Sequence, residues 1–312
     1  MKTLKQCEIC KNKDFKFLFN QTDKNFNFPD EFSLYECKKC KLIFINPQPS
    51  YKELEKYYPT EDYYAFWGIT KKEESKKVKL KLFLYDLYYN PKNKNKFLKL
   101  LFSPIKFLVR GVRMGRDQKL LDFGSGSGQF LYEMKQFGID VWGIEPGDFD
   151  KSTAKSLRIK PDLMEAKYPN DFFDIVTMNH VLQHVNNPTQ ILKEIHRVLD
   201  KKGVFILGVS NYRSLAYSLF TKNWLQLDIP RHLSNYSDKL LCSFLEKNNF
   251  QVIRKYYNSR PNQFVDSLYF KLNIVERRGI LYKILKILFL PLTWIVNALK
   301  LGDQMEVWCV KK

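Results

Sequence analysis

The chain has 312 residues, enough to bury one full-sized catalytic domain with one or two small additions. Hydrophobic residues make up 45% of the chain and aromatic residues 15%, a composition that excludes a largely disordered protein. The formal net charge of +19 favours polyanionic partners such as nucleic acid, anionic lipid or phosphorylated substrates, although AT-rich coding also produces such an abundance of Lys. The N-terminus carries no apolar secretory segment, so we expect a cytoplasmic protein with reduced thiols.

Residues 1–49 form the first predicted unit, a zinc ribbon. Cys7 and Cys10 make one CxxC pair, and Cys37 and Cys40 make a second pair after 26 intervening residues, which a β-hairpin could fill. Two such pairs supply four thiolates for tetrahedral Zn²⁺ and leave no open position for catalysis. An iron–sulfur cluster is the alternative for such a ligand set, whereas disulfides are disfavoured in a reducing compartment. We therefore expect structural Zn²⁺.

Residues 50–118 are expected to form a basic helical connector, or lid, between this unit and the main domain. Residues 71–119 hold fifteen Lys and Arg against four acidic residues, and 97–112 combine apolar and basic residues in an amphipathic pattern. Tyr63, Tyr64 and Trp67 could face a substrate as part of a lid, or could simply pack together.

From residue 119 to about 210, apolar strand patterns alternate with helix patterns. Strands are expected near 119–123, 141–145, 173–178 and 204–209, and a helix is expected over 188–199. Such alternation predicts βαβ units and a mostly parallel α/β sheet. A helix at 238–248 and a strand at 251–257 follow, then a mostly helical insertion at 262–301 and a last strand near 304–311. The main domain is thus expected to run from 119 to 312.

A glycine-rich turn follows the first of these strands, in Asp122-Phe-Gly-Ser-Gly-Ser-Gly128. Glycines there let the backbone approach a ligand closely. Dinucleotide sites use Gly-x-Gly-x-x-Gly, but here the third glycine comes one position earlier and Gln129 takes its place. Glu145 ends the next strand, at a spacing that suits a carboxylate binding both ribose hydroxyls. The ligand is therefore expected to be a nucleoside without a pyrophosphate.

This region resembles the class I S-adenosylmethionine-dependent methyltransferases. Their first motif matches residues 120–128, and the segment from Asn179 to Val185 resembles their fourth-strand segment, with Gln183 in place of a common Glu. The resemblance implies a Rossmann-like sheet with an antiparallel last strand. It places the glycines at the methionine portion of the cofactor, Glu145 at the ribose, residues 179–181 beside the sulfonium and the adenine near residues 163 and 164. The cofactor contacts that it implies are Asp122, Gly124, Ser125, Gly126, Gly128, Phe130, Glu145, Pro146, Asn179, His180 and Val181.

The segment Pro230-Arg-His-Leu233 carries the expected catalytic residues. It resembles a segment of the zinc-ribbon methyltransferases of glycan biosynthesis. The resemblance suggests His232 as the base that removes a proton from the acceptor, and Arg231 as the group that holds a substrate phosphate or carboxylate. In the alternative interpretation, His232 caps a helix that starts near Ser237 and Arg231 is merely exposed.

The apolar stretch from Ile280 to Leu299 is long enough to span a membrane. Lys283, Lys286 and Pro291 argue against a span, as does the strand that must afterwards return to the sheet. The segment is expected either to pack on the domain or to lie peripherally on the inner face of an anionic membrane.

Taken together, the motifs predict methyl transfer to a sugar, nucleotide-sugar or lipid-linked glycan, as in surface-polysaccharide biosynthesis. The first alternative is an RNA methyltransferase, which a zinc ribbon and a basic surface would suit. It is less favoured, because the fourth-strand segment has Asn179-His-Val-Leu in place of an Asn-Pro-Pro-Tyr or Asp-Pro-Pro-Tyr motif. The second alternative is a non-catalytic scaffold that binds the cofactor.

Overall fold

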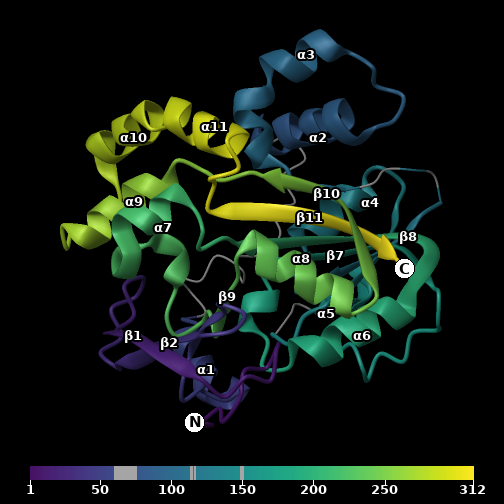
Figure 1. The fold of residues 1–312 in the computed structure, drawn as a ribbon. Coiled ribbons are helices and arrows are strands. Elements are labelled where there is room, and N and C mark those ends of the chain that lie inside the picture. Colours follow the sequence, from purple (N-terminus) through teal and green to yellow (C-terminus); the bar gives the residue numbers. More distant parts are fainter. Residues whose placement is uncertain (60–75, 113–114, 116, 148–150) are drawn as a thin grey trace.

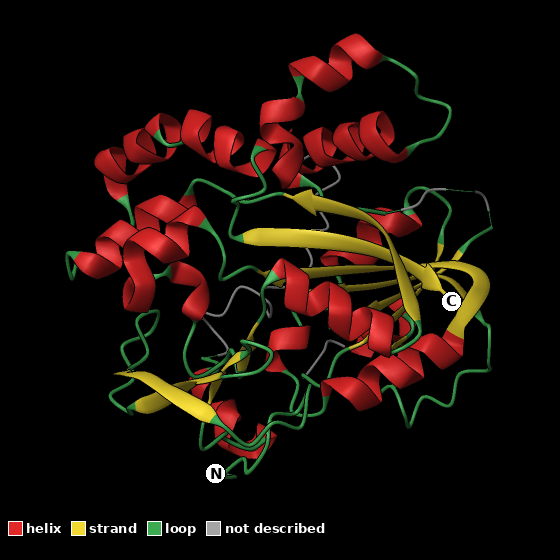
Figure 2. Cartoon of the chain, viewed as in Figure 1, coloured by secondary structure: helices red, strands yellow, loops and turns green. Residues whose placement is uncertain are grey.

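The computed structural model describes residues 1–59, 76–112, 115, 117–147 and 151–312. Tyr63, Tyr64 and Trp67, the expected lid residues, lie outside the described residues. Helices cover both faces of a central sheet, and a smaller group of strands near the N-terminus lies at one end (Figures 1 and 2).

The central sheet has seven strands in the order β10-β11-β8-β7-β4-β5-β6. Strands β4 to β8 run parallel to one another, and β11 is antiparallel to both β8 and β10. The strands are β4 (Lys119–Phe123), β5 (Asp140–Ile144), β6 (Ile159–Lys160), β7 (Phe173–Asn179), β8 (Leu199–Ser210), β10 (Phe250–Tyr257) and β11 (Gln304–Lys311). This topology confirms the predicted Rossmann-like sheet with its antiparallel last strand.

Helices pack on the sheet through apolar stripes. Helix α6 shows how: Asn187 accepts the Gln190 N–H as N-cap, Pro188 occupies the first turn, and Leu192 and Ile195 are fully buried against the sheet. Helices α6 and α8 contribute to the core on one face, and α2, α4 and α5 contribute to the core on the other. Their bounds are α2 (Lys76–Tyr89), α4 (Gln129–Lys135), α5 (Lys151–Leu157), α6 (Pro188–Val198) and α8 (Asp238–Lys247).

The connector and the C-terminal insertion are mostly helical where the structure describes them, as the sequence predicts. The connector also holds α1 (Tyr51–Leu54), η1 (Glu55–Tyr57), α3 (Lys96–Leu101) and η3 (Ser103–Leu108). The insertion consists of α9 (Asn262–Lys271), α10 (Gly279–Leu288) and α11 (Leu290–Ala298). Short elements that were not expected are η4 (Leu182–His184), α7 (Leu215–Phe220), η5 (Thr221–Asn223) and η6 (Leu225–Leu227).

The N-terminal unit is not a separate appendage. Its strands β1 (Phe15–Gln21), β2 (Phe32–Cys37) and β3 (Ile43–Ile45) form an antiparallel sheet, whose fourth strand is β9 (Ser234–Asn235) from the main domain. Its buried Cys7, Leu42 and Phe44 belong to the same hydrophobic core as α6 and α8. The predicted boundary at residue 49 therefore marks no break in packing.

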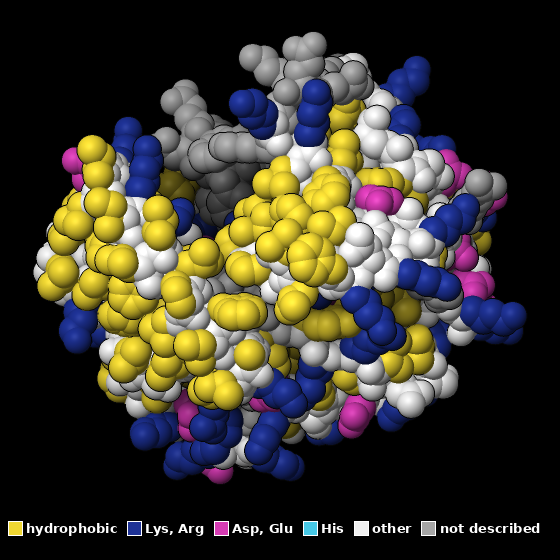
Figure 3. Space-filling view, turned by 90° about the horizontal axis from the view of Figure 1, so that it is seen from above, with side chains coloured by type: hydrophobic (Ala, Val, Ile, Leu, Met, Phe, Trp, Pro, Cys, Tyr) yellow, Lys and Arg dark blue, Asp and Glu magenta, His cyan; other side chains and the backbone are white. Residues whose placement is uncertain are grey.

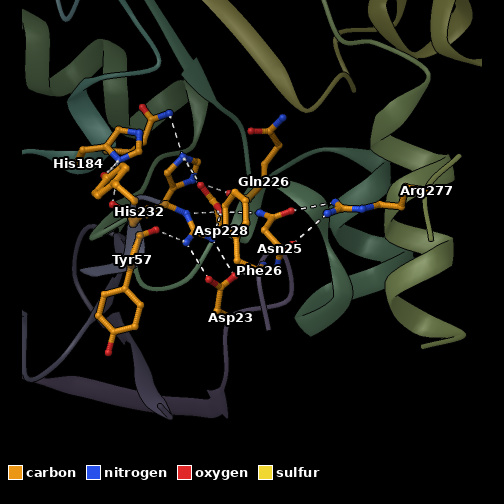
Figure 4. A network of polar contacts seen from close by, with 12 residues as sticks. Asp23, Asn25, Phe26, Tyr57, His184, Gln226, Asp228, His232 and Arg277 are labelled. Carbon is orange, nitrogen blue, oxygen red and sulfur yellow. Dashed lines mark hydrogen bonds and ion pairs between the residues drawn. The ribbon is translucent and has the colours of Figure 1, made fainter. Parts of the chain in front are cut away.

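A buried arginine, Arg231, also joins the two parts through Asp23, Tyr57 and Asp228, which are labelled in Figure 4. Arg231, which is 0% exposed, donates to both carboxylate oxygens of Asp23 at 2.8 Å and to Asp228 Oδ1 at 2.7 and 3.0 Å. It also donates to the carbonyl oxygen of Tyr57 at 2.9 Å. One guanidinium thus ties together the N-terminal unit, the connector and the loop before β9.

Replacing Arg231 with Ala should lower the free energy of unfolding by about 3–5 kcal/mol, because two buried carboxylates would lose their countercharge. The matched control is Arg254→Ala, which removes an exposed arginine on β10 and should cost less than about 0.5 kcal/mol. Urea denaturation of both variants measures the difference. Equal costs would show that the Arg231 ion pairs do not hold the two parts together.

Candidate active site

A large cavity opens at the carboxyl ends of the parallel strands, where α/β sheets bind ligands. Its volume is about 1750 Å³, and segments after β4, β5 and β7 contribute to its walls. Nine of the eleven expected cofactor contacts line it: Gly124, Ser125, Gly126, Phe130, Glu145, Pro146, Asn179, His180 and Val181. Asp122 and Gly128 lie behind the wall, and of the two expected adenine neighbours only Leu163 lines the cavity.

The glycine loop depends on backbone angles and close contacts that only glycine allows. The backbone N–H groups of Gly124 and Ser125 donate to Ile144 O at 2.7 and 3.1 Å, which ties the loop to the end of β5. Gly124 has a φ of +75°, and a Cβ there would lie 2.1 Å from Val181 Cγ2. Gly128 has a φ of +79° and is the N-cap of α4. The loop therefore packs directly against the segment that follows β7.

Glu145 completes the same edge of the cavity. Its Oε2 accepts the N–H of Gly126 at 2.8 Å, so the acid and the glycine loop form one continuous wall. Burial raises the pKa of Glu145, and the hydrogen bonds from the Gly126 and Gly147 amides oppose that rise. A carboxylate at this place can accept hydrogen bonds from the two hydroxyls of a ribose.

Arg110 is a site residue that the sequence reasoning missed. Its Nη2 lies 2.9 Å from Oδ2 of the fully buried Asp122, whose Oδ1 accepts the Thr177 hydroxyl at 2.6 Å. Burial raises the pKa of Asp122, and the positive charge of Arg110 opposes that rise. The guanidinium lies on the cavity wall, 3.6 Å from the ring centre of Phe130. Asp122 fixes its position, and the guanidinium could bind the carboxylate of a methionine moiety. In the sequence Arg110 is one of many basic connector residues, so only its place in the fold distinguishes it.

Three histidines, His180, His184 and His232, line the cavity, and the last two lie side by side (Figure 4). His232 Nδ1 lies 2.7 Å from the carbonyl oxygen of Gln226, so this nitrogen must carry the proton and Nε2 must be the acceptor. His232 Nε2 lies 3.4 Å from Gln183 Nε2 and 3.8 Å from Asp228 Oδ2. The ring of His184 stands nearly perpendicular to that of His232, with centres 4.7 Å apart.

Burial keeps these imidazoles neutral. It lowers the pKa of His232 to about 3 and that of His180 to about 4, and it also lowers the pKa of His184. A neutral His232 with an unprotonated Nε2 can accept a proton from an acceptor molecule in the cavity.

The expected role of Arg231 needs correction. The sequence suggested that it holds a substrate anion, but its guanidinium is wholly buried and paired with Asp23 and Asp228. We reassign it as a positioning residue that holds Asp228 beside His232. The helix-cap alternative for His232 is also wrong, because Ser237 itself caps α8 by accepting the Leu240 N–H.

The four N-terminal cysteines converge on one point. The sulfur of Cys7 lies 3.5 Å from that of Cys40, Cys10 and Cys37 are 3.5 Å apart, and all four lie within 4.8 Å of one another. Sulfurs on a tetrahedral Zn²⁺ lie about 3.8 Å apart, since each Zn–S bond is about 2.3 Å long. The arrangement therefore fits the predicted structural Zn²⁺.

Comparison with known proteins gives the family. A family model described as a methyltransferase domain matches residues 84–255, more than half of the chain. The chain belongs to this family and is a class I S-adenosylmethionine-dependent methyltransferase. The predicted enzyme class and the predicted organic cofactor are thereby confirmed.

The individual relatives are more distant. An uncharacterized protein of Methanocaldococcus jannaschii is 31% identical over 116 residues, which cover 37% of this chain and 51% of that protein. The ubiquinone biosynthesis O-methyltransferase of Pseudomonas aeruginosa is 29% identical over 111 residues, which cover 32% of this chain and 47% of the relative. The chain thus spans about half the length of the curated relatives it matches. A crystal structure of an S-adenosylmethionine-dependent methyltransferase from Archaeoglobus fulgidus has 16% identity and a TM-score of 0.42, and the match covers 74% of this chain and 99% of that chain. None of these names refers to a glycan, so the glycan acceptor stays a prediction.

Gly124→Ala should abolish cofactor binding and lower the free energy of unfolding by about 1–3 kcal/mol more than Gly138→Ala does. The two glycines have nearly equal φ values of +75° and +74°, but an added Cβ would strike Val181 at position 124 and meets nothing within 4 Å at position 138. Gly138→Ala therefore carries only the backbone strain, about 1 kcal/mol. Urea denaturation and calorimetry with S-adenosylmethionine test the pair, and equal losses would contradict the close packing at Gly124.

Glu145→Ala should weaken S-adenosylmethionine binding roughly ten- to a hundredfold, the usual worth of hydrogen bonds to a charged group. Glu246→Ala, an exposed acid on α8, serves as the control and should leave the affinity unchanged. Isothermal titration calorimetry measures both. If the affinity of Glu145→Ala equals that of the native chain, Glu145 does not contact the cofactor.

Proposed function

We propose that the chain transfers a methyl group to a hydroxyl of a sugar or glycan acceptor, with His232 as the base. The observation that carries the proposal is the fixed tautomer of His232, which leaves Nε2 unprotonated on the cavity wall. The name of the Pseudomonas aeruginosa relative, an O-methyltransferase, supports an oxygen acceptor.

The lining of the cavity supports a polyhydroxylated acceptor. Carboxamide side chains can both donate and accept hydrogen bonds, as sugar hydroxyls do. The carboxamides on the cavity wall are Asn25, Asn179, Asn186, Gln129, Gln226, Asn258, Asn262 and Gln304. Arg260 and Lys286 also line the cavity and would suit the phosphate of a nucleotide-linked or lipid-linked sugar, whereas Lys81 is paired with Glu133 at 2.9 Å. Such substrates are typical of surface-polysaccharide synthesis on the cytoplasmic side.

The reaction requires a positioned nucleophile and a place for its proton. S-adenosylmethionine, when bound, supplies a sulfonium methyl carbon as the electrophile. The acceptor oxygen would bond to that carbon as its carbon–sulfur bond breaks and S-adenosylhomocysteine leaves, and His232 Nε2 would take the hydroxyl proton. Asp228, 3.8 Å away, stabilises the resulting imidazolium. Burial opposes ionisation of Asp228, but the positive charge of Arg231 holds the pKa of this carboxyl well below its usual range, so it is ionised.

His232→Ala should keep S-adenosylmethionine affinity but lower turnover about 10²- to 10⁴-fold, the usual contribution of a general base. The control is His196→Ala, on the outer helix α6, which should keep full turnover. The assay is S-adenosylhomocysteine release with a panel of nucleotide-activated sugars. Undiminished turnover in His232→Ala would remove it as base, and inactivity of the native chain with every sugar would contradict the acceptor class.

The pH profile of the native chain offers a second test of the same base. Because the pKa of His232 is about 3, Nε2 is unprotonated throughout pH 5–8, and this group should cause no fall in kcat/KM on acidification through that range. The opposite result would be an activity loss with a midpoint near pH 6.5 that is absent from the His232→Gln variant. It would show that His232 titrates as an ordinary, solvent-exposed histidine.

A further inference from the structure

Helix α10 presents its aliphatic side to the outside. Ile280, Leu281, Ile284, Ile287 and Leu288 are between 45% and 76% exposed. Their spacing of one, four, seven and eight residues places them on one side of the helix. In a helix that packs on a soluble core, such a stripe normally faces inward.

The inward side of α10 holds polar anchors that fix this orientation. The hydroxyl of Tyr282 donates to Asp266 Oδ1 at 2.7 Å and accepts from Asn262 Nδ2 at 3.0 Å, both on α9. The amine of Lys286 lies 5.2 Å from the ring centre of Tyr282, and Lys286 lines the cavity. The hydrogen bonds and the cavity wall thus require the aliphatic stripe to face outward.

Neighbouring elements extend this surface. Helices α2, α3, α10 and α11 lie at the same end of the molecule (Figure 1), and hydrophobic side chains cover large areas of that end with Lys and Arg among them (Figure 3). We call the following exposed residues the apolar face: Phe97, Leu100, Leu101, Ile280, Leu281, Ile284, Ile287, Leu288, Trp294 and Ile295. Scattered exposed apolar residues are normal, but a gathering of this size marks an interaction surface.

The charges around the apolar face are almost all positive. Residues 277–301 contain five Lys and Arg and no acidic residue, and residues 76–112 contain ten against the single Asp86. Basic side chains beside an aliphatic stripe, together with an exposed tryptophan, are the composition of a helix that lies in the interface of an anionic bilayer. A second copy of this chain would instead place two strongly basic surfaces together.

The segment lies along a surface and does not cross a membrane. Gly279–Ala298 has 20 residues and a mean hydropathy of 1.7, which would suffice for a span by length and composition. However, α9 before it and β11 after it are both packed in the same domain, and Gly302 O accepts a hydrogen bond from the buried Asn211. Both ends of the segment are therefore held on one side, whereas a spanning helix would separate them by about 30 Å.

We propose that the apolar face lies on an anionic lipid surface and that the cavity receives an amphipathic acceptor from that surface. The second part rests on the proposed function. Helix α10 carries part of the apolar face and also lines the cavity through Lys286. The neighbouring η3 and α2 line the cavity through Phe107, Leu108 and Lys81. A lipid-linked acceptor could then keep its apolar tail in the bilayer while its polar head reaches His232.

The test is flotation of the full chain with vesicles of phosphatidylcholine containing phosphatidylglycerol, against vesicles of phosphatidylcholine alone. We expect binding to the anionic vesicles that weakens as salt is raised. Ile287→Glu should reduce the bound fraction at least fivefold, and the uncharged Ile287→Ser should reduce it at least twofold. The matched control is Phe17→Glu, which places the same charge at an exposed apolar residue of β1, at the other end of the molecule (Figure 1).

Two results would overturn the proposal: native chain that does not float with anionic vesicles, or equal binding by the native chain and Ile287→Glu. A dimer that Ile287→Glu dissociates, without vesicle binding, would assign the apolar face to a second copy. Calorimetry with S-adenosylmethionine on the same samples separates this proposal from the enzymatic one. If the chain binds the cofactor and methylates sugars but does not float, only the proposal of lipid binding is wrong. If it floats but methylates no sugar, the proposal of a sugar acceptor is wrong.

Discussion

The guanidinium of Arg231 carries its charge at every physiological pH and is fully removed from water, so the surrounding protein must neutralise it. Asp23, from the N-terminal unit, and Asp228, from the loop before β9, do so from two distant parts of the chain. The same pairing keeps Asp228 ionised beside His232. The position of the N-terminal unit and the electrostatics of the cavity are therefore consequences of one buried charge.

Features set by local spacing could be predicted from the sequence. The glycine loop, Glu145 and the four cysteines are fixed by short intervals along the chain, and the parallel strands show as apolar runs separated by helices. The role of Arg231 could not be predicted, because it depends on Asp23, 208 residues away. Strand β9 could not be predicted either, because two residues are too few to show the alternation of a strand. The sequence of α10 likewise shows an aliphatic stripe but not which side faces the core, since that depends on the hydrogen bonds of Tyr282 with α9.

The charge distribution in the cavity agrees with a cationic methyl donor. Protonated imidazoles near the bound sulfonium would repel it, and burial prevents this by keeping His180, His184 and His232 neutral. The cation of Arg110 instead stands beside Asp122 and the glycine loop, where the resemblance places the methionine end of the cofactor. Burial of the three histidines therefore keeps them in the neutral form that methyl transfer requires.

The ladder between β3 and β9 joins two sites that do different work. Strand β3 belongs to the unit that holds the four cysteines, and β9 directly follows the loop that carries His232. Two ligands that each favour the same placement of a shared strand raise one another's affinity by an identical factor. Binding of an acceptor beside His232 would then raise the affinity of the cysteines for Zn²⁺. Zn²⁺ would raise the affinity for the acceptor by the same factor. If both ligands favour one placement of these strands, a site that performs no chemistry would contribute to the free energy of substrate binding.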